Sequence, residues 1–126
     1  MDDAHWKAKL TTEQYRVLRQ SGTEYPGTGH LLNEKRPGAY HCVGCGQLLF
    51  EAETKYESHC GWPAFWAEAA GANIRRIEDR SHGMLRVEVR CSGCDGHLGH
   101  VFEDGPPPSG ERYCINSVIL EFRPSS

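Results

Sequence analysis

Two Cys-x-x-Cys pairs place the strongest constraint on the fold of this chain. The first pair is Cys42 and Cys45, and the second is Cys91 and Cys94. This spacing is typical of a structural zinc site, in which each tight turn holds two thiolates about 2.3 Å from a tetrahedral ion. Because a long segment separates the two pairs, such an ion would tie distant parts of the chain together and support its folding.

A disulfide framework and a thioredoxin-like redox motif are the alternatives to zinc. The N-terminus lacks the apolar segment of a secretory signal. We therefore expect a reducing compartment, the cytoplasm, where structural disulfides are uncommon. A redox Cys-x-x-Cys also needs a βαβ context, which neither pair has. The sequence favours Zn²⁺ bound by four cysteines.

Length and composition indicate a single domain over residues 1–126, with a tail at 1–10 and a frayed end at 123–126. The net charge of −3 argues against nucleic acid or an anionic membrane surface as partner. No stretch approaches the roughly 18 apolar residues of a membrane helix. The 14 glycines and 7 prolines predict many turns between short elements.

The hydrophobic pattern predicts a mainly β fold with one or two short helices near the N-terminus. Thr11 and Gln14 form a capping box for a helix over 11–22, with Gly22 just beyond its end. A further short helix is expected within 62–71. Strands are predicted at 47–50, 85–90, 97–102 and 111–122, and a loop at 105–110.

The last predicted strand places a cysteine in a polar setting. Side chains alternate along a strand, so Arg112, Cys114 and Asn116 share one face, and Tyr113 and Ile115 share the other. A guanidinium beside a thiol favours the nucleophilic thiolate. A buried structural cysteine is the alternative, since free cysteine is often found in protein cores.

Two more segments carry groups suited to chemistry. His97 and His100 follow the second cysteine pair and are suited to hydrogen bonding or proton transfer, or are simply surface histidines. Cys60 lies in the turn Cys60-Gly61-Trp62-Pro63, where a mobile thiol could reach a partner. Trp62 there offers an apolar platform for a methyl or thioether group, with core packing as the alternative.

Taken together, the motifs resemble the methionine sulfoxide reductase B family, whose members reduce the R epimer of methionine sulfoxide. The resemblance covers most of the chain and begins near Gly22-Thr23-Glu24. It continues through Tyr40-His41-Cys42-Val43-Gly44-Cys45, Cys60-Gly61-Trp62-Pro63-Ala64-Phe65, Ser81-His82-Gly83-Met84, Cys91-Ser92-Gly93-Cys94, His97-Leu98-Gly99-His100-Val101-Phe102 and Arg112-Tyr113-Cys114-Ile115-Asn116-Ser117. One departure is His59, which stands where many members have glycine.

The resemblance implies a role for each matching residue. Cys114 corresponds to the nucleophile and Cys60 to the resolving cysteine, and the two Cys-x-x-Cys pairs correspond to structural zinc ligands. The implied polar catalytic positions are His97, His100 and Asn116, and the implied substrate-binding positions are Trp62, Phe102, Arg112 and Asp104. The implied fold is two antiparallel sheets packed in a small β-tent, and the implied partners are oxidised proteins as substrates and thioredoxin as reductant.

The resemblance also implies a reaction sequence. The Cys114 thiolate attacks the sulfoxide and becomes a sulfenic acid, which Cys60 converts to a disulfide for an external dithiol to reduce. One rival is a non-catalytic zinc-ribbon-like binding module, in which both extra cysteines are spectators. A second is a cysteine hydrolase using Cys114 with His100, but it would have no use for Cys60.

Overall fold

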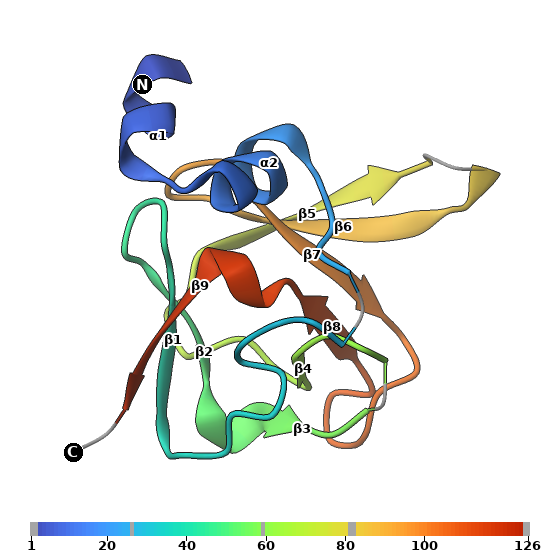
Figure 1. The fold of residues 1–126 in the computed structure, drawn as a ribbon. Helices are drawn as coiled ribbons and strands as arrows, with labels where there is room; N and C mark the ends of the chain where they lie inside the picture. The colour runs from blue at the N-terminus through green and yellow to red at the C-terminus, as the bar shows by residue number, and fades with distance from the viewer. Residues whose placement is uncertain (1–2, 26, 59, 81–82, 125–126) are drawn as a thin grey trace.

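The computed structural model describes residues 3–25, 27–58, 60–80 and 83–124, and contains two antiparallel β-sheets (Figure 1). The six-stranded sheet has the order β3-β4-β8-β7-β6-β5, and the three-stranded sheet has the order β2-β1-β9. The strands are β1 (Gly38–Cys42), β2 (Leu48–Glu51), β3 (Lys55–Tyr56), β4 (Ala64–Phe65), β5 (Ile74–Asp79), β6 (Arg86–Cys91), β7 (His97–Phe102), β8 (Arg112–Ile115) and β9 (Leu120–Pro124). The helices are α1 (Asp3–Lys9) and α2 (Thr12–Gln20), with 3-10 turns η1 (Ala52–Thr54) and η3 (Ser117–Ile119).

The predicted fold class is confirmed, and so are three of the predicted strands. Those at 47–50, 85–90 and 97–102 lie within one residue of β2, β6 and β7. Strands β1, β3 and β5 were not predicted from the sequence. In β5 the two isoleucines lie three residues apart, so the alternating pattern that marks β6 is absent.

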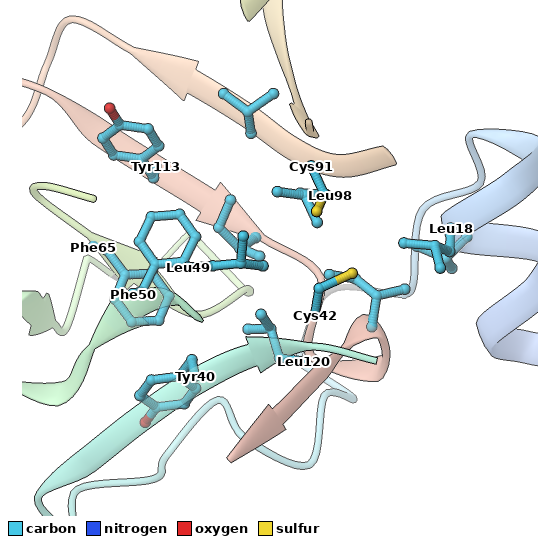
Figure 2. Close-up of a cluster of buried hydrophobic side chains, with 14 of the residues drawn as sticks. Leu18, Tyr40, Cys42, Leu49, Phe50, Phe65, Cys91, Leu98, Tyr113 and Leu120 are labelled. Carbon is cyan, nitrogen blue, oxygen red and sulfur yellow. The ribbon is translucent and has the colours of Figure 1, made fainter. Parts of the chain in front are cut away.

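Buried hydrophobic side chains fill the space between the two sheets (Figure 2). Tyr40 and Leu120 contribute from the three-stranded sheet, and Leu98 and Tyr113 from the six-stranded sheet. Leu18 of α2 joins the same cluster at one end. Burying each leucine contributes about 2 kcal/mol. The core therefore holds β7 and β8 in place through their buried side chains, such as Leu98 and Tyr113.

Helix α2 begins as its N-terminal capping signals predict, but its C-terminal end differs from the prediction. The Thr11 side chain accepts a hydrogen bond from the backbone N–H of Gln14, and the Gln14 side chain accepts one from the backbone N–H of Thr11, so the capping box is confirmed. The residue in the left-handed conformation is Ser21, with φ of 57°, where the sequence had suggested Gly22. Gly22 follows it and donates its N–H to the Arg16 carbonyl oxygen.

Residues Asp3–Lys9 form the packed helix α1, whereas a tail over 1–10 was predicted. In α1, Trp6 is only 3% exposed, and the Arg19 guanidinium lies 4.6 Å from its ring centroid. Leu10 is also buried, so Trp6 and Leu10, four residues apart, both face the core. This spacing is typical of an amphipathic helix and was not recognised in the sequence. Within the described residues, no helix has the length and apolar character needed to cross a membrane.

The single strand predicted over 111–122 is two strands in different sheets. After β8 the Asn116 N–H donates to the Leu98 carbonyl oxygen, and the chain then turns through η3. It continues as β9, which pairs with β1. Arg123 and Pro124 belong to β9 and pair with β1, so the predicted fraying does not start at 123. Residues 125–126 lie outside the described residues.

The short helix expected within 62–71 is absent, and β4 takes its place. Phe65 is fully buried and stacks on Phe50 with ring centroids 4.4 Å apart. Pro63 has no N–H to donate to a helix, and its carbonyl oxygen accepts a hydrogen bond from the Ile115 N–H. Pairing with β3 and β8 thus outweighs the local helical preference of the alanine-rich segment.

Candidate active site and metal centre

The four cysteines of the Cys-x-x-Cys pairs meet at one point, as predicted. Their sulfurs lie within 4.8 Å of one another. The Cys42 and Cys94 sulfurs are 3.7 Å apart, and the Cys45 and Cys91 sulfurs are 3.4 Å apart. Four thiolates around a zinc ion at about 2.3 Å would have sulfurs about 3.8 Å apart, so the cluster matches a tetrahedral zinc site in size.

Groups around this cluster also suit thiolate ligands. The Gly44 N–H donates to the Cys42 sulfur over 3.3 Å, and the Gln47 side-chain amide donates to the Cys91 sulfur over 3.0 Å. Donors of this kind stabilise the negative charge of metal-bound sulfur. Glycine is needed at position 93, because a Cβ there would lie 2.9 Å from the Cys45 sulfur. The residues present therefore fit a zinc ion.

The remaining two cysteines are in direct contact, although they are far apart in the sequence. The Sγ atoms of Cys60 and Cys114 lie 2.8 Å apart. Cys114 is on β8, and its register partners are Ala64 on β4 and His100 on β7. Cys60 comes from the connection between β3 and β4. The structure thus brings the two predicted redox cysteines together.

The two thiols share charge unequally. Contact with Cys114 lowers the pKa of Cys60 to about 5, although burial acts in the opposite direction. Contact with Cys60 and burial raise the pKa of Cys114, while the Arg112 guanidinium lowers it. The contact between the two sulfurs therefore favours negative charge on Cys60, whereas the Arg112 guanidinium favours it on Cys114, in the direction that the sequence predicts.

A cavity of about 230 Å³ opens beside Cys114. Six of the predicted site residues line it: Trp62, His100, Phe102, Arg112, Cys114 and Asn116. A glycine is required on its wall, since a Cβ at Gly99 would lie 2.0 Å from the Cys114 carbonyl oxygen. The cavity combines aromatic walls with nitrogen donors, which suits a ligand that has both an apolar and a polar end.

The two histidines differ in their surroundings. The His100 Nε2 lies 2.9 Å from an Asp79 carboxylate oxygen, which orients the ring toward the cavity lining. His97 is 4% exposed, and its Nδ1 lies 2.7 Å from a Glu88 carboxylate oxygen. Burial lowers the pKa of His97, although Glu88 acts to raise it. His97 is therefore placed behind His100, with ring centroids 5.6 Å apart.

Asn116 is held by backbone groups on both sides. Its amide nitrogen donates to the Leu98 carbonyl oxygen over 2.9 Å, and its amide oxygen accepts from the Glu24 N–H over 3.0 Å. The Trp62 indole N–H in turn donates to the Glu24 carbonyl oxygen over 3.0 Å. Asn116 thereby links β7 to the segment that positions Trp62.

Glu24 is a site residue that the sequence analysis did not identify. It is 4% exposed, and one carboxylate oxygen accepts a hydrogen bond from the Val118 N–H over 3.0 Å. Its position in an irregular glycine-containing segment gave no periodic signal of burial. Thr23 and Arg86, which line the cavity, were likewise not assigned a role, whereas Glu24 is not among the lining residues.

Asp104 lies away from this cavity. Its carboxylate accepts two hydrogen bonds from Arg112, over 2.9 and 3.1 Å, so it orients the guanidinium. Three residues of the sequence motifs, His59, Ser81 and His82, lie outside the described residues.

Comparison with known proteins agrees with this geometry. The family model described as SelR domain matches residues 10–124. A peptide methionine sulfoxide reductase MsrB from Cellvibrio japonicus is 58% identical over 94% of this chain and 85% of its own. Proteins of the same name from Pseudomonas putida (strain W619) and Hahella chejuensis are 56% and 54% identical, over 94% and 95% of this chain and 90% and 86% of theirs. The chain is therefore an oxidoreductase of the MsrB family of peptide methionine sulfoxide reductases.

Proposed function

We propose that this protein reduces the R epimer of methionine sulfoxide in oxidised proteins, with Cys114 as nucleophile and Cys60 as resolving thiol. The observation that carries the proposal is the 2.8 Å contact between the two sulfurs at the edge of the cavity. A hydrolase has no use for this contact, and a binding module has no use for either thiol. The free thiols suit a reducing compartment, so we place the reaction in the cytoplasm.

In the first step the Cys114 sulfur attacks the sulfoxide sulfur, and the sulfur–sulfur bond so formed breaks again as the oxygen passes to Cys114. The Cys60 thiolate accepts the proton that Cys114 loses, across the contact between the two sulfurs. His100, directly opposite Cys114 in the register, protonates the sulfoxide oxygen as the sulfur–oxygen bond breaks. Oxygen transfer leaves methionine and a sulfenic acid on Cys114, so the substrate gains two electrons and Cys114 loses two.

In the second step the Cys60 sulfur attacks the sulfenic acid. A sulfur–sulfur bond forms, and the oxygen leaves as water. The thiol is already in contact with Cys114, so this step needs little movement and protects Cys114 from further oxidation. Thioredoxin, a dithiol, then supplies two electrons and restores both thiols.

Epimer selectivity follows from the placement of the cavity walls. Trp62 takes the methyl group, and His100 faces the oxygen. Only one configuration at sulfur satisfies both contacts while Cys114 approaches from the third side. A zinc ion held by the four clustered cysteines supplies structural support rather than chemistry.

An assay with the separate epimers of a dabsylated methionine sulfoxide tests this proposal. With dithiothreitol as reductant, we expect the R epimer to be converted to methionine and the S epimer to remain. Trp62→Ala should weaken the preference, because it removes the methyl platform. Equal conversion of both epimers by the unmodified protein would contradict the assignment.

A further inference from the structure

The two histidines of the site contact different carboxylates. Glu88 is the register partner of His100 on the neighbouring strand β6, yet its carboxylate contacts the His97 Nδ1 over 2.7 Å and the Arg90 Nε over 2.9 Å. His100 contacts Asp79 instead, with 2.9 Å between its Nε2 and the Asp79 Oδ2. The carboxylate that serves His100 therefore comes from β5, the strand beyond β6 at the edge of the six-stranded sheet (Figure 1).

The Asp79 carboxylate is itself held in place. Its register partner on β6 is Arg86, and the Arg86 Nη2 lies 3.4 Å from the same Oδ2 that contacts His100. The Asp79 side chain is 19% exposed and the His100 side chain 13%, so the contact is largely shielded from water. Arginine does not lose its proton in proteins, so it keeps a positive charge beside this carboxylate. Asp79 is therefore placed to act as a fixed negative charge on the ring of His100.

We propose that Asp79 is a positioning residue of the reduction step, which holds His100 by its Nε2 so that the proton for the sulfoxide oxygen leaves from Nδ1. This inference rests on the proposed function, in which His100 supplies that proton. His100 lines the substrate cavity and is the register partner of Cys114, whereas Asp79 is not among the lining residues. Asp79 therefore acts through His100 and does not touch the substrate.

The proton balance follows from the two ring nitrogens. The protonated ring of His100 carries one proton on each nitrogen, and its Nε2–H donates to Asp79. As the sulfur–oxygen bond breaks, Nδ1 gives its proton to the oxygen, which becomes the hydroxyl group of the Cys114 sulfenic acid. The ring is left neutral, with its Nε2–H still bonded to Asp79. A negative carboxylate favours the protonated ring before this transfer and fixes its orientation throughout.

Other charged and titratable groups face His100 from the strands around it. They are Arg86 and Glu88 on β6, His97 on β7 itself, and Arg112 and Cys114 on β8. The two arginines disfavour a further positive charge here, and the carboxylate of Glu88 is engaged by His97 and Arg90. Asp79 is the carboxylate in hydrogen-bond contact with His100. Removing its charge should therefore change how the reaction depends on pH.

A substitution that keeps the shape of Asp79 but removes its charge tests the inference. Asp79→Asn is compared with Glu78→Gln, which makes the same carboxylate-to-amide change at the exposed preceding residue of β5, on the other face of the strand. Methionine released from the R sulfoxide in a single turnover is timed from mildly acidic to alkaline pH. We expect Asp79→Asn to be about tenfold slower than Glu78→Gln near neutral pH, and its rate to fall on the alkaline side at a pH about one unit lower.

A merely structural role for Asp79 would slow the reaction by the same factor at every pH. That result, or a pH profile that coincides with that of Glu78→Gln, would overturn the inference, while methionine release by the unmodified protein would leave the proposed function standing. No release from the R sulfoxide by the unmodified protein would contradict the proposed function itself, and the inference with it.

A second pair of variants identifies the donating nitrogen and does not depend on how well Asp79→Asn folds. His100→Asn places an amide N–H near the position of Nδ1, and His100→Gln places one near the position of Nε2. Both variants lack the ring proton and should be slow. We expect His100→Asn to release methionine about tenfold faster than His100→Gln, because the amide of His100→Gln is directed to Asp79 and not to the sulfoxide oxygen. Equal rates, or a faster His100→Gln, would overturn the inference.

Discussion

The Arg112 guanidinium points at the sulfur of Cys114, with Nη1 donating a hydrogen bond over 2.8 Å. The two residues share a face of β8 because side chains alternate along the strand. Asp104 holds the other side of the guanidinium, and the Phe102 ring centroid lies 4.5 Å from its central carbon. Arg112 is thus fixed in orientation, so it favours negative charge on Cys114 at a defined place.

Replacing this guanidinium should slow the first step. In Arg112→Met the pKa of Cys114 rises, because both the charge and the hydrogen bond that lower it are lost. We expect methionine release in a single turnover to slow by about tenfold or more. The rate of Arg112→Lys should lie between those of the unmodified protein and Arg112→Met, since lysine keeps the positive charge but lacks the several N–H donors of the guanidinium. An unchanged rate in Arg112→Met would contradict this role.

Removing the resolving thiol should make Cys114 more acidic. The contact with Cys60 is the largest cause that raises the pKa of Cys114. In Cys60→Ser we therefore expect this pKa to fall, while one equivalent of methionine is still released and thioredoxin-dependent turnover stops. Alkylation of Cys114 by iodoacetamide, followed from acid to alkaline pH by peptide mass, measures the shift. A pKa that stays the same or rises would count against the contact.

In the unmodified protein, Cys60 should be alkylated at unusually low pH. Its pKa of about 5 lies below the ordinary value of 9.0, so the thiolate is present at neutral pH. The alkylation rate should fall only as acid takes the pH below about 5, where Cys60 gains its proton. A midpoint near the ordinary cysteine value would contradict the proton sharing between the two sulfurs.

Loss of one clustered cysteine should destabilise the fold, whereas loss of the resolving cysteine should not. We expect Cys91→Ser to lower the free energy of unfolding by several kcal/mol, because metal binding contributes directly to folding. Cys60→Ser is the matched control, since it makes the same chemical change outside the cluster. Zinc content and thermal unfolding measure both variants, and equal melting temperatures with retained zinc would exclude a structural metal at Cys91.

The buried carboxylate of Glu24 should stabilise the segment whose backbone carbonyl accepts the hydrogen bond from Trp62. Glu24→Ala leaves the Val118 N–H without its acceptor, so we expect a loss of about 1–3 kcal/mol in unfolding free energy. Glu24→Gln keeps an acceptor oxygen and should lose less. Urea unfolding measures both, with Glu103→Ala as the exposed control. A fully stable Glu24→Ala protein would show that this hydrogen bond is dispensable.

The local sequence pattern was sufficient to predict the site residues where a strand is regular and one of its faces is buried. The alternation around Cys114 correctly placed Arg112 and Asn116 on one face, because β8 is regular and its other face is buried. The Cys-x-x-Cys spacing likewise predicted the metal cluster, since each pair lies in one tight turn. In both cases the deciding geometry lies within a few residues.

Contacts between distant segments were not accessible from the sequence in the same way. The break between β8 and β9 depends on the Asn116 N–H pairing with Leu98, and both strands alternate, so the pattern shows no boundary. Glu24 is buried because Val118 approaches it from the other end of the chain. The pKa values of the two reactive cysteines likewise depend on a sulfur contact across 54 residues, which local spacing does not contain.

A quenched single turnover without reductant tests the central claim most directly. The protein is mixed with one equivalent of the R sulfoxide, and methionine, remaining thiols and disulfide-linked peptides are measured together. We predict one methionine per chain and a single new disulfide joining Cys60 to Cys114, with neither product in Cys114→Ser. Methionine formation by Cys114→Ser, or a disulfide that joins another pair of cysteines, would contradict the account.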